Sequence, residues 1–262
     1  DPQALAACRA SSLAARRFRW LLGLALTNDG LLACNLHEPS AMLYKFALVG
    51  SMDELAAVPA LGDDGDYGQV NYGQGFKRCA VHQQTQRTYA IVGEEGHHAL
   101  ILLDANLQVV AIVEEADAPE EVGGLEYSED DNGPICDIAV HGDQVIVLTS
   151  DRHEKGSGLR LLDLDGRYLR TIAAALFENP HAFTVSHGRA FVVDDDNDNA
   201  ITDWEAGKVL YVIDILSGDI LQSVRFELKQ EVLAMLVDGD EIYIAGFNAS
   251  QVIVLQYAGS EV

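Results

Sequence analysis

The stretch DIAVHGDQVIVLTS, residues 137–150, holds two short apolar runs that are joined by the polar turn HGD. The following stretch LRLLDLDGRYLRTI, residues 159–172, holds two more apolar runs on either side of a turn that contains glycine. Short, nearly continuous apolar runs bounded by glycine and aspartate are typical of β-strands that are buried on both faces. The two stretches together therefore predict four consecutive short strands.

The same order of strands and turns recurs along the chain, in the segments 22–46, 79–113, 137–172, 182–226 and 234–257. A four-stranded unit cannot bury its faces alone, whereas several units packed around an axis cover one another and leave only short outer edges. The repeats therefore predict an all-β protein, a β-propeller of five to six four-stranded blades. An immunoglobulin-like sandwich is the alternative, and the regular repetition disfavours it.

The first residues differ in character from the repeats and suggest a separate segment, 1–19, before a propeller domain at 20–262. Alanine, leucine and arginine recur at helical spacing over residues 3–18, which predicts a short N-terminal helix. The fifth repeat ends before a fourth strand, so the stretch ARRFRW, residues 15–20, is a candidate for the strand that closes the ring. The other explanation is that the chain, which begins with Asp1, is a fragment or a processed form.

The charge of the chain limits the kinds of partner that it can bind. It has 41 Asp and Glu against 17 Lys and Arg, a formal net charge of −24, which repels the phosphates of nucleic acids and anionic lipids. No apolar run approaches the ~20 residues of a membrane-spanning helix. We therefore expect no nucleic acid partner and no membrane span, but a protein partner with a basic surface, compatible with a place in a larger assembly.

The repeat at 137–172 resembles the NHL-repeat and related six-bladed β-propellers, whose repeats run from a GIAVD-like inner strand to a VFD-x-x-G-like third strand. The chain departs from that pattern because it has five repeats, and because the loop DRHEKGSG, residues 151–158, replaces a short turn. In the resembling folds, the loops between strands two and three and those between blades share one face. Here these loops include the acidic stretches 62–69 and 114–133, so the resemblance implies an acidic face.

A further acidic stretch, DDDNDNAITDWE at 194–205, is similar to an EF-hand calcium loop over its full twelve positions. The expected Ca²⁺ ligands are Asp194, Asp196, Asp198, the carbonyl of Ala200, Thr202 through water, and Glu205 as a bidentate ligand. Asn199 stands where such loops have glycine, and the flanking sequences predict strands instead of helices. A calcium site and a solvated acidic loop both remain open.

Motifs for nucleophilic or phosphate chemistry are absent from the sequence, which has no G-x-S-x-G, no G-x-x-x-x-G-K-[ST] and no H-E-x-x-H. We therefore expect a non-catalytic β-propeller, an interaction or scaffold protein that presents an acidic, calcium-binding face to a protein partner. The alternative is a metal-dependent hydrolase or lactonase of the six-bladed class, in which acids of the central channel hold the ion.

Overall fold

The computed structural model describes residues 21–35, 42–47, 54–59, 76–94, 97–113, 135–150, 157–196, 207–228, 232–246 and 252–257. All regular secondary structure in these ranges is β-strand, and none of their residues belongs to a helix that could cross a membrane. The predicted helix at 3–18 and the candidate closing strand at 15–20 lie outside the described residues. The chain divides into two compact units.

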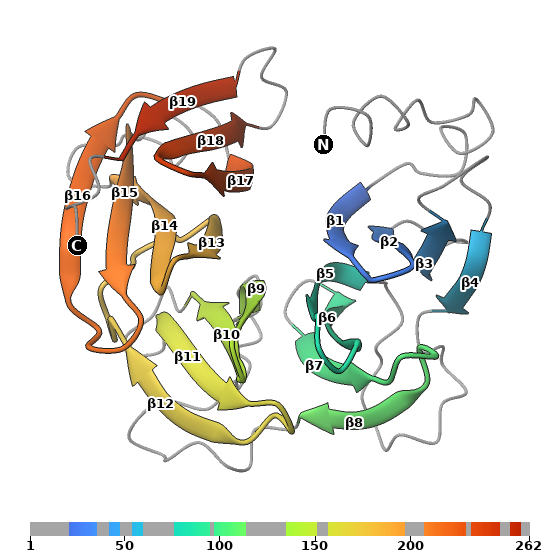
Figure 1. Ribbon diagram of the computed structural model, residues 1–262. Helices are drawn as coiled ribbons and strands as arrows, with labels where there is room; N and C mark the ends of the chain where they lie inside the picture. Colours follow the sequence, from blue (N-terminus) through green and yellow to red (C-terminus); the bar gives the residue numbers. More distant parts are fainter. Residues whose placement is uncertain are drawn as a thin grey trace. The chain divides into compact units, whose positions relative to one another are not determined.

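Unit 1 comprises Asp1–Ala116, Tyr127–Gly133 and Asp165–Arg167, and it contains two four-stranded antiparallel sheets (Figure 1). The first sheet has β1 (Leu21–Leu26), β2 (Gly30–Asn35), β3 (Met42–Ala47) and β4 (Glu54–Pro59), and the second has β5 (Phe76–His82), β6 (Arg87–Glu94), β7 (His97–Leu103) and β8 (Val109–Val113). Leu32, Leu43, Ile101 and Leu103 pack together in its apolar core and have 0% exposure. The fourth strand of the first sheet, β4, lies beyond the predicted first repeat, which ended at residue 46.

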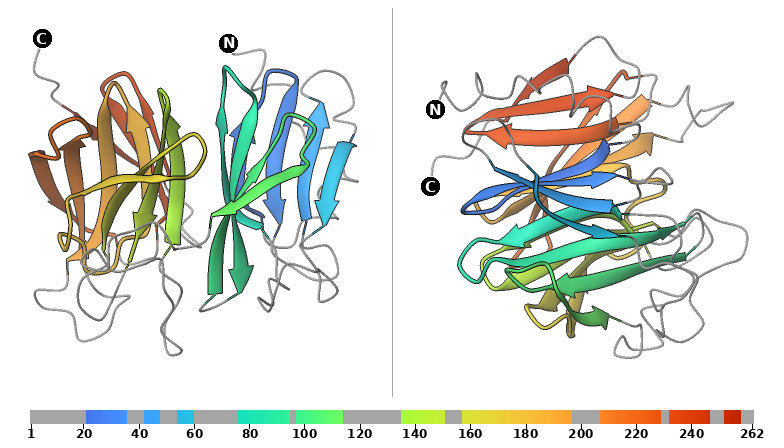
Figure 2. Two further views of the ribbon diagram at one scale, coloured as in Figure 1. Left: turned by 90° about the horizontal axis from the view of Figure 1, so that it is seen from below. Right: turned by 90° about the vertical axis from the view of Figure 1, so that its right-hand side faces the viewer.

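Unit 2 comprises Asp117–Glu126, Pro134–Leu164 and Tyr168–Val262, and it contains three antiparallel sheets, seen from the side in Figure 2. The first of these sheets has β9 (Ile135–His141), β10 (Gln144–Thr149), β11 (Gly158–Asp163) and β12 (Tyr168–Ile172). The middle sheet has β13 (Ala182–Ser186), β14 (Arg189–Asp196), β15 (Gly207–Asp214) and β16 (Ile220–Phe226). The last sheet has β17 (Val232–Asp238), β18 (Glu241–Gly246) and β19 (Val252–Gln256). The middle sheet buries both of its faces. Val192 and Ile213 belong to one core cluster, and Val193 and Val212 belong to the other.

Tight turns join the first two strands of the sheets in unit 2, and the predicted turn HGD, residues 141–143, is one of them. His187 and Gly188 both have positive φ, 50° and 73°, which is the conformation of a type I′ hairpin turn. Gly142 has a φ of 54°. A Cβ added to either glycine would meet no atom within 4 Å, so the backbone conformation alone favours glycine there.

The five sheets coincide with the five predicted repeats, and the fold belongs to the β-propeller class, with five blades of three or four strands. The prediction of an all-β propeller is confirmed at this level. The described chain forms five blades, the lower of the two numbers expected, and the last blade has three strands in the described residues.

Candidate functional site

The acidic stretch begins within a strand, whereas the sequence analysis placed all of it in a loop. Strands β14 and β15 form a hairpin in which Asp195 lies opposite Lys208 and Asp196 lies opposite Gly207. Asp194 and Asp195 are 2% and 4% exposed. The carboxylates at the start of the stretch are therefore buried at the base of the hairpin from which residues 197–206 extend.

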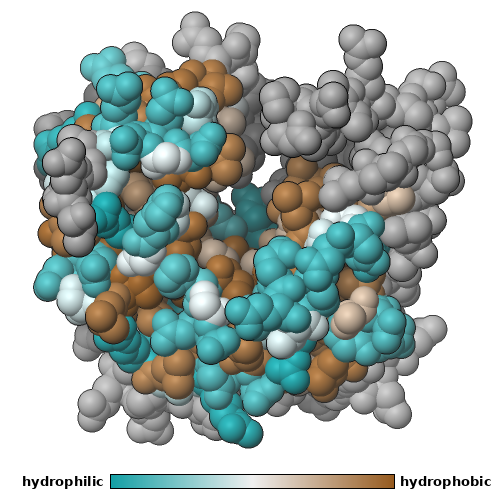
Figure 3. All heavy atoms as spheres, in the orientation of Figure 1, coloured by the Kyte–Doolittle hydropathy of each residue, from teal (hydrophilic) through white to brown (hydrophobic). Residues whose placement is uncertain are grey.

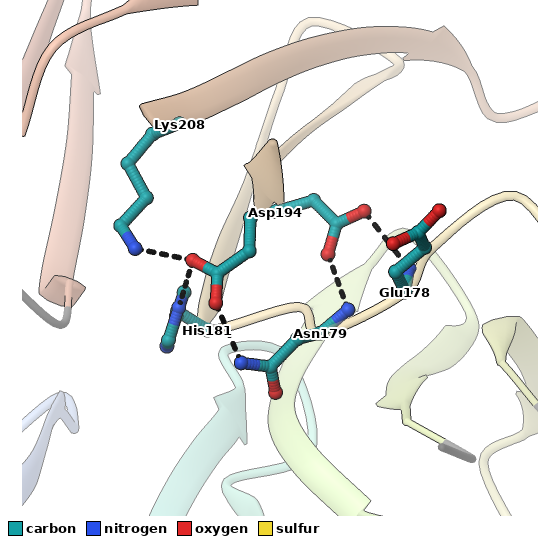
Figure 4. A network of polar contacts seen from close by, with 6 residues as sticks. Glu178, Asn179, His181, Asp194 and Lys208 are labelled. Atoms are coloured by element: carbon teal, nitrogen blue, oxygen red, sulfur yellow. Dashed lines mark hydrogen bonds and ion pairs between the residues drawn. The ribbon is translucent and has the colours of Figure 1, made fainter. Parts of the chain in front are cut away.

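Asp195 is the centre of a buried polar network, and its partners Asn179, His181 and Lys208 are labelled in Figure 4. Its Oδ1 atom accepts a hydrogen bond from Lys208 Nζ, and the side chains of both residues are 1% exposed. The same oxygen lies 2.7 Å from Nε2 of His181, and Asn179 Nδ2 donates to Oδ2 at 2.7 Å. Lys208 therefore neutralises the buried carboxylate, and both carboxylate oxygens have hydrogen-bond partners, as a charged group in a protein interior requires.

The electrostatic balance at Asp195 favours its ionised form. Burial raises the pKa of the carboxyl group, but this effect is outweighed by the hydrogen bond and charge of His181 and by the hydrogen bonds from Lys208 and Asn179. The pKa of Asp195 consequently lies below its ordinary value. Lys208 and Asp195 thus form an ion pair inside the protein.

Asp194 connects the hairpin to the segment that leads into β13. Its Oδ2 accepts the backbone N–H of Glu178 at 3.0 Å, and its Oδ1 accepts that of Asn179 at 2.7 Å. Burial raises the pKa of Asp194 to about 6, although the backbone hydrogen bonds oppose the shift. The two amides therefore hold a carboxylate that is poorly solvated, and the carboxylate fixes the turn at 178–179.

The predicted calcium ligands are only partly described by the structure. Asp194 uses both oxygens to accept amide hydrogens, and Asp196 ends β14. Asp198, Ala200, Thr202 and Glu205 lie outside the described residues. Among the described residues, no group of three or more His, Cys, Asp or Glu is arranged to hold a metal ion. The calcium site stays a prediction.

Sequence reasoning missed the partners of the buried carboxylates, namely Asn179, His181 and Lys208. A signal for one of them was present, because Lys208 precedes the mainly apolar run VLYVIDI, residues 209–215. A lysine at that place, shortly after a run of aspartates, is suited to a cross-strand ion pair. Asn179 and His181 lie in the segment before β13, and only the tertiary fold brings this segment close to Asp195.

Exposed charges on the described side chains are mostly negative. The exposed acids are Asp29, Asp143, Asp165, Glu178, Asp219, Glu227, Asp238 and Asp240, whereas the exposed basic residues in the same part of the chain are Arg167 and Arg225. Several of the remaining cations make internal contacts. Lys45 pairs with Asp29 at 2.8 Å, and Arg170 donates to the carbonyl oxygens of Ile215 and Leu216 at 2.7 and 2.8 Å.

No protein-family model matches the chain, and no curated protein matches it either. Among solved structures, a chain of a nidogen–laminin complex is similar to it, with 12% sequence identity and a TM-score of 0.60 over 91% of this chain and 76% of that one. Hydrazine synthase of Kuenenia stuttgartiensis is also similar, with 13% identity and a TM-score of 0.59 over 89% of this chain and 64% of that one. The Dos1 propeller is similar as well, with 12% identity and a TM-score of 0.51 over 90% of this chain and 55% of that one. Identities this low show the fold alone, which is that of a β-propeller.

Proposed function

We propose that this chain is a non-catalytic β-propeller that presents an acidic surface to a protein partner with a basic surface. The observation that carries the proposal is the distribution of charge: exposed acids outnumber exposed cations among the described side chains, while Lys45, Arg170 and Lys208 are used for internal contacts. Hydrophilic side chains also cover much of the face drawn in Figure 3. Such a surface attracts cationic partners and speeds their encounter.

The buried network supports a structural role for its charged groups. Asp194, Asp195 and Lys208 are 1–4% exposed and their hydrogen bonds are made within the protein, so they are poorly placed to meet a substrate. Their contribution is to fix the hairpin that carries residues 197–206. For the alternative, a metal-dependent hydrolase, no observation in the described part of the chain provides specific support.

A labelled peptide of eight lysines tests the proposal, with fluorescence anisotropy as the measurement. We expect binding at low salt and a loss of affinity of roughly tenfold or more when the salt rises from about 0.05 M to 0.5 M, because screening shortens the range of exposed charges. A peptide of eight glutamates is the control and should not bind. Absence of oligolysine binding at low salt, or an affinity that salt leaves unchanged, would contradict the proposal.

We also propose that residues 194–205 bind one Ca²⁺, which the spacing of Asp194, Asp196, Asp198 and Glu205 supports. The backbone pairing of Asp196 with Gly207 supports it further, because it closes the base of the segment that would surround the ion. The amide contacts of Asp194 leave each of its oxygens a second lone pair for a metal.

Calcium should raise the melting temperature of the chain, since an ion that binds only the folded state stabilises it by about 2.7 kcal/mol at a hundredfold excess over Kd. Glu205→Gln should remove most of this rise, because it removes the bidentate ligand. Glu227→Gln, which changes an exposed glutamate elsewhere in unit 2, is the matched control and should keep the rise. A melting curve of the unaltered chain that neither millimolar Ca²⁺ nor EDTA moves would refute the site.

A further inference from the structure

Two free cysteines lie close together in the core of unit 1. Cys34 belongs to β2 and Cys79 belongs to β5, and these strands of different sheets pack against each other. Both side chains are part of one core cluster, in which Cys34 is 0% exposed and Cys79 is 8% exposed. The two thiol groups are within hydrogen-bonding distance of each other. The pair therefore lies at the junction between the first and the second blade.

Gly23 leaves room for this contact. It lies in β1, opposite Cys34. A Cβ atom added to Gly23 would lie 3.4 Å from Sγ of Cys34 and 3.0 Å from Cα of Arg78, the residue that precedes Cys79. The sulfur of Cys34 and the backbone of β5 thus meet over a residue that has no side chain, which permits the close approach of the two strands.

The surroundings of the pair favour uncharged forms of sulfur. The core cluster around it is apolar and includes Leu32, Val81 and Val92. Burial and the contact with Cys79 raise the pKa of the Cys34 thiol well above its ordinary value. Among the described residues, no group of three or more metal-binding side chains includes the pair, whereas a structural zinc site takes four ligands. A disulfide carries no charge, so it suits this core better than a pair of thiolates.

We propose that Cys34 and Cys79 form a disulfide bond under oxidising conditions and that this bond ties β2 to β5. Its formation brings the two sulfurs from contact to about 2.05 Å. The bond closes a loop of about 45 residues that contains β3 and β4, and it restricts the unfolded chain more than the folded one. The oxidised chain is therefore the more stable form. This inference does not depend on the proposed function.

The oxidant is a small-molecule disulfide such as oxidised glutathione, and the bond forms by two exchange steps. The thiolate of Cys79, the more exposed of the two, attacks one sulfur of the oxidant, which gives a mixed disulfide and releases one thiol. The thiolate of Cys34 then attacks the sulfur of Cys79, and the second thiol leaves. The two cysteine sulfurs lose two electrons in total, the oxidant gains them, and the released thiols take up the two protons.

Burial slows both steps in the folded chain, because the thiolate is the attacking species and a buried thiol rarely ionises. We therefore expect the bond to form fastest while the chain refolds in the presence of the oxidant. The experiment starts from the full chain in urea with dithiothreitol, and refolding takes place in a mixture of oxidised and reduced glutathione.

Peptide mapping of the unaltered chain detects the bond directly. After refolding, the remaining thiols are alkylated and the chain is digested with trypsin without reduction. The four cysteines lie on separate tryptic peptides, because Lys or Arg residues separate them. Peptide 20–45 linked to peptide 79–87 should be the main cross-linked product, and dithiothreitol should abolish it. Alkylation of both Cys34 and Cys79, or random pairing of the four cysteines, would overturn the proposal.

The melting temperature gives a second measurement. The oxidised chain should melt roughly 5–10 °C above the chain kept in dithiothreitol, because the cross-link restricts the unfolded state. Cys79→Ala should abolish this difference. Cys136→Ala is the matched control and should keep it, because Cys136 packs against a core cluster of unit 2. A difference that survives Cys79→Ala, or an unaltered chain that melts alike in both states, would refute the proposal.

Discussion

Lys208→Met should lower the free energy of unfolding by about 3–5 kcal/mol, because it leaves Asp195 as a buried carboxylate without its cation. His181 and Asn179 still contact this carboxylate at 2.7 Å, but Asn179 is neutral and the side chain of His181 is 12% exposed. Methionine has a similar length and fills much of the same space, so the loss reports the charge more than the packing. Urea unfolding at pH 7, with the midpoint and the slope both fitted, measures the change.

Lys45→Met is the matched control, because Lys45 pairs with Asp29, whose side chain is 65% exposed. An ion pair of that kind contributes at most about 1 kcal/mol, so its loss should be small. Adding Asp195→Leu to Lys208→Met should restore part of the stability, since the interior then holds no unpaired carboxylate. If Lys208→Met were no more harmful than Lys45→Met, the pair would not anchor the hairpin.

The blades could be predicted from the sequence because their information is local. Runs such as QVIVLT in β10 and AFVVD in β14, separated by glycine turns, specify short buried strands wherever they occur. The end of β14 could not be placed in the same way. The composition of residues 194–196 predicts a loop. These residues nevertheless belong to a strand, in which Asp195 pairs with Lys208 and Asp194 accepts hydrogen bonds from the amides of residues 178–179.

The candidate site was harder to predict because its contacts join residues that are distant in the chain. Asn179 and His181 reach Asp195 from the segment before β13, and no periodicity in the sequence links them. The last sheet has three strands in the described residues, and residues 15–20, the candidate for its fourth strand, lie outside them. Which side of that sheet is exposed depends on packing against β13–β16, and packing of this kind is not encoded in one repeat alone.

Asp194 should make the stability of the chain rise as the solution is acidified from about pH 6.5 to pH 4.5. Burial raises the pKa of this group from 3.8 to about 6 in the folded state, and the unfolded chain has the ordinary value. Between these values the folded state binds more protons than the unfolded state, so the free energy of unfolding increases as pH falls and decreases as pH rises. Asp195, whose pKa is lowered, has the opposite effect, but in a window below 3.8.

For a single group with these values, linkage predicts a gain of about 2 kcal/mol between pH 6.5 and 4.5. The whole chain also gains stability as its net charge of −24 diminishes, so the comparison must isolate one residue. Asp194→Asn should remove about that amount from the pH dependence, because the amide does not titrate, whereas Asp219→Asn at an exposed turn should remove little. Urea unfolding of the three proteins at both pH values measures this difference. Equal pH dependence in the unaltered chain and in Asp194→Asn would mean that the carboxylate is solvated and that it does not hold the 178–179 turn from a buried position.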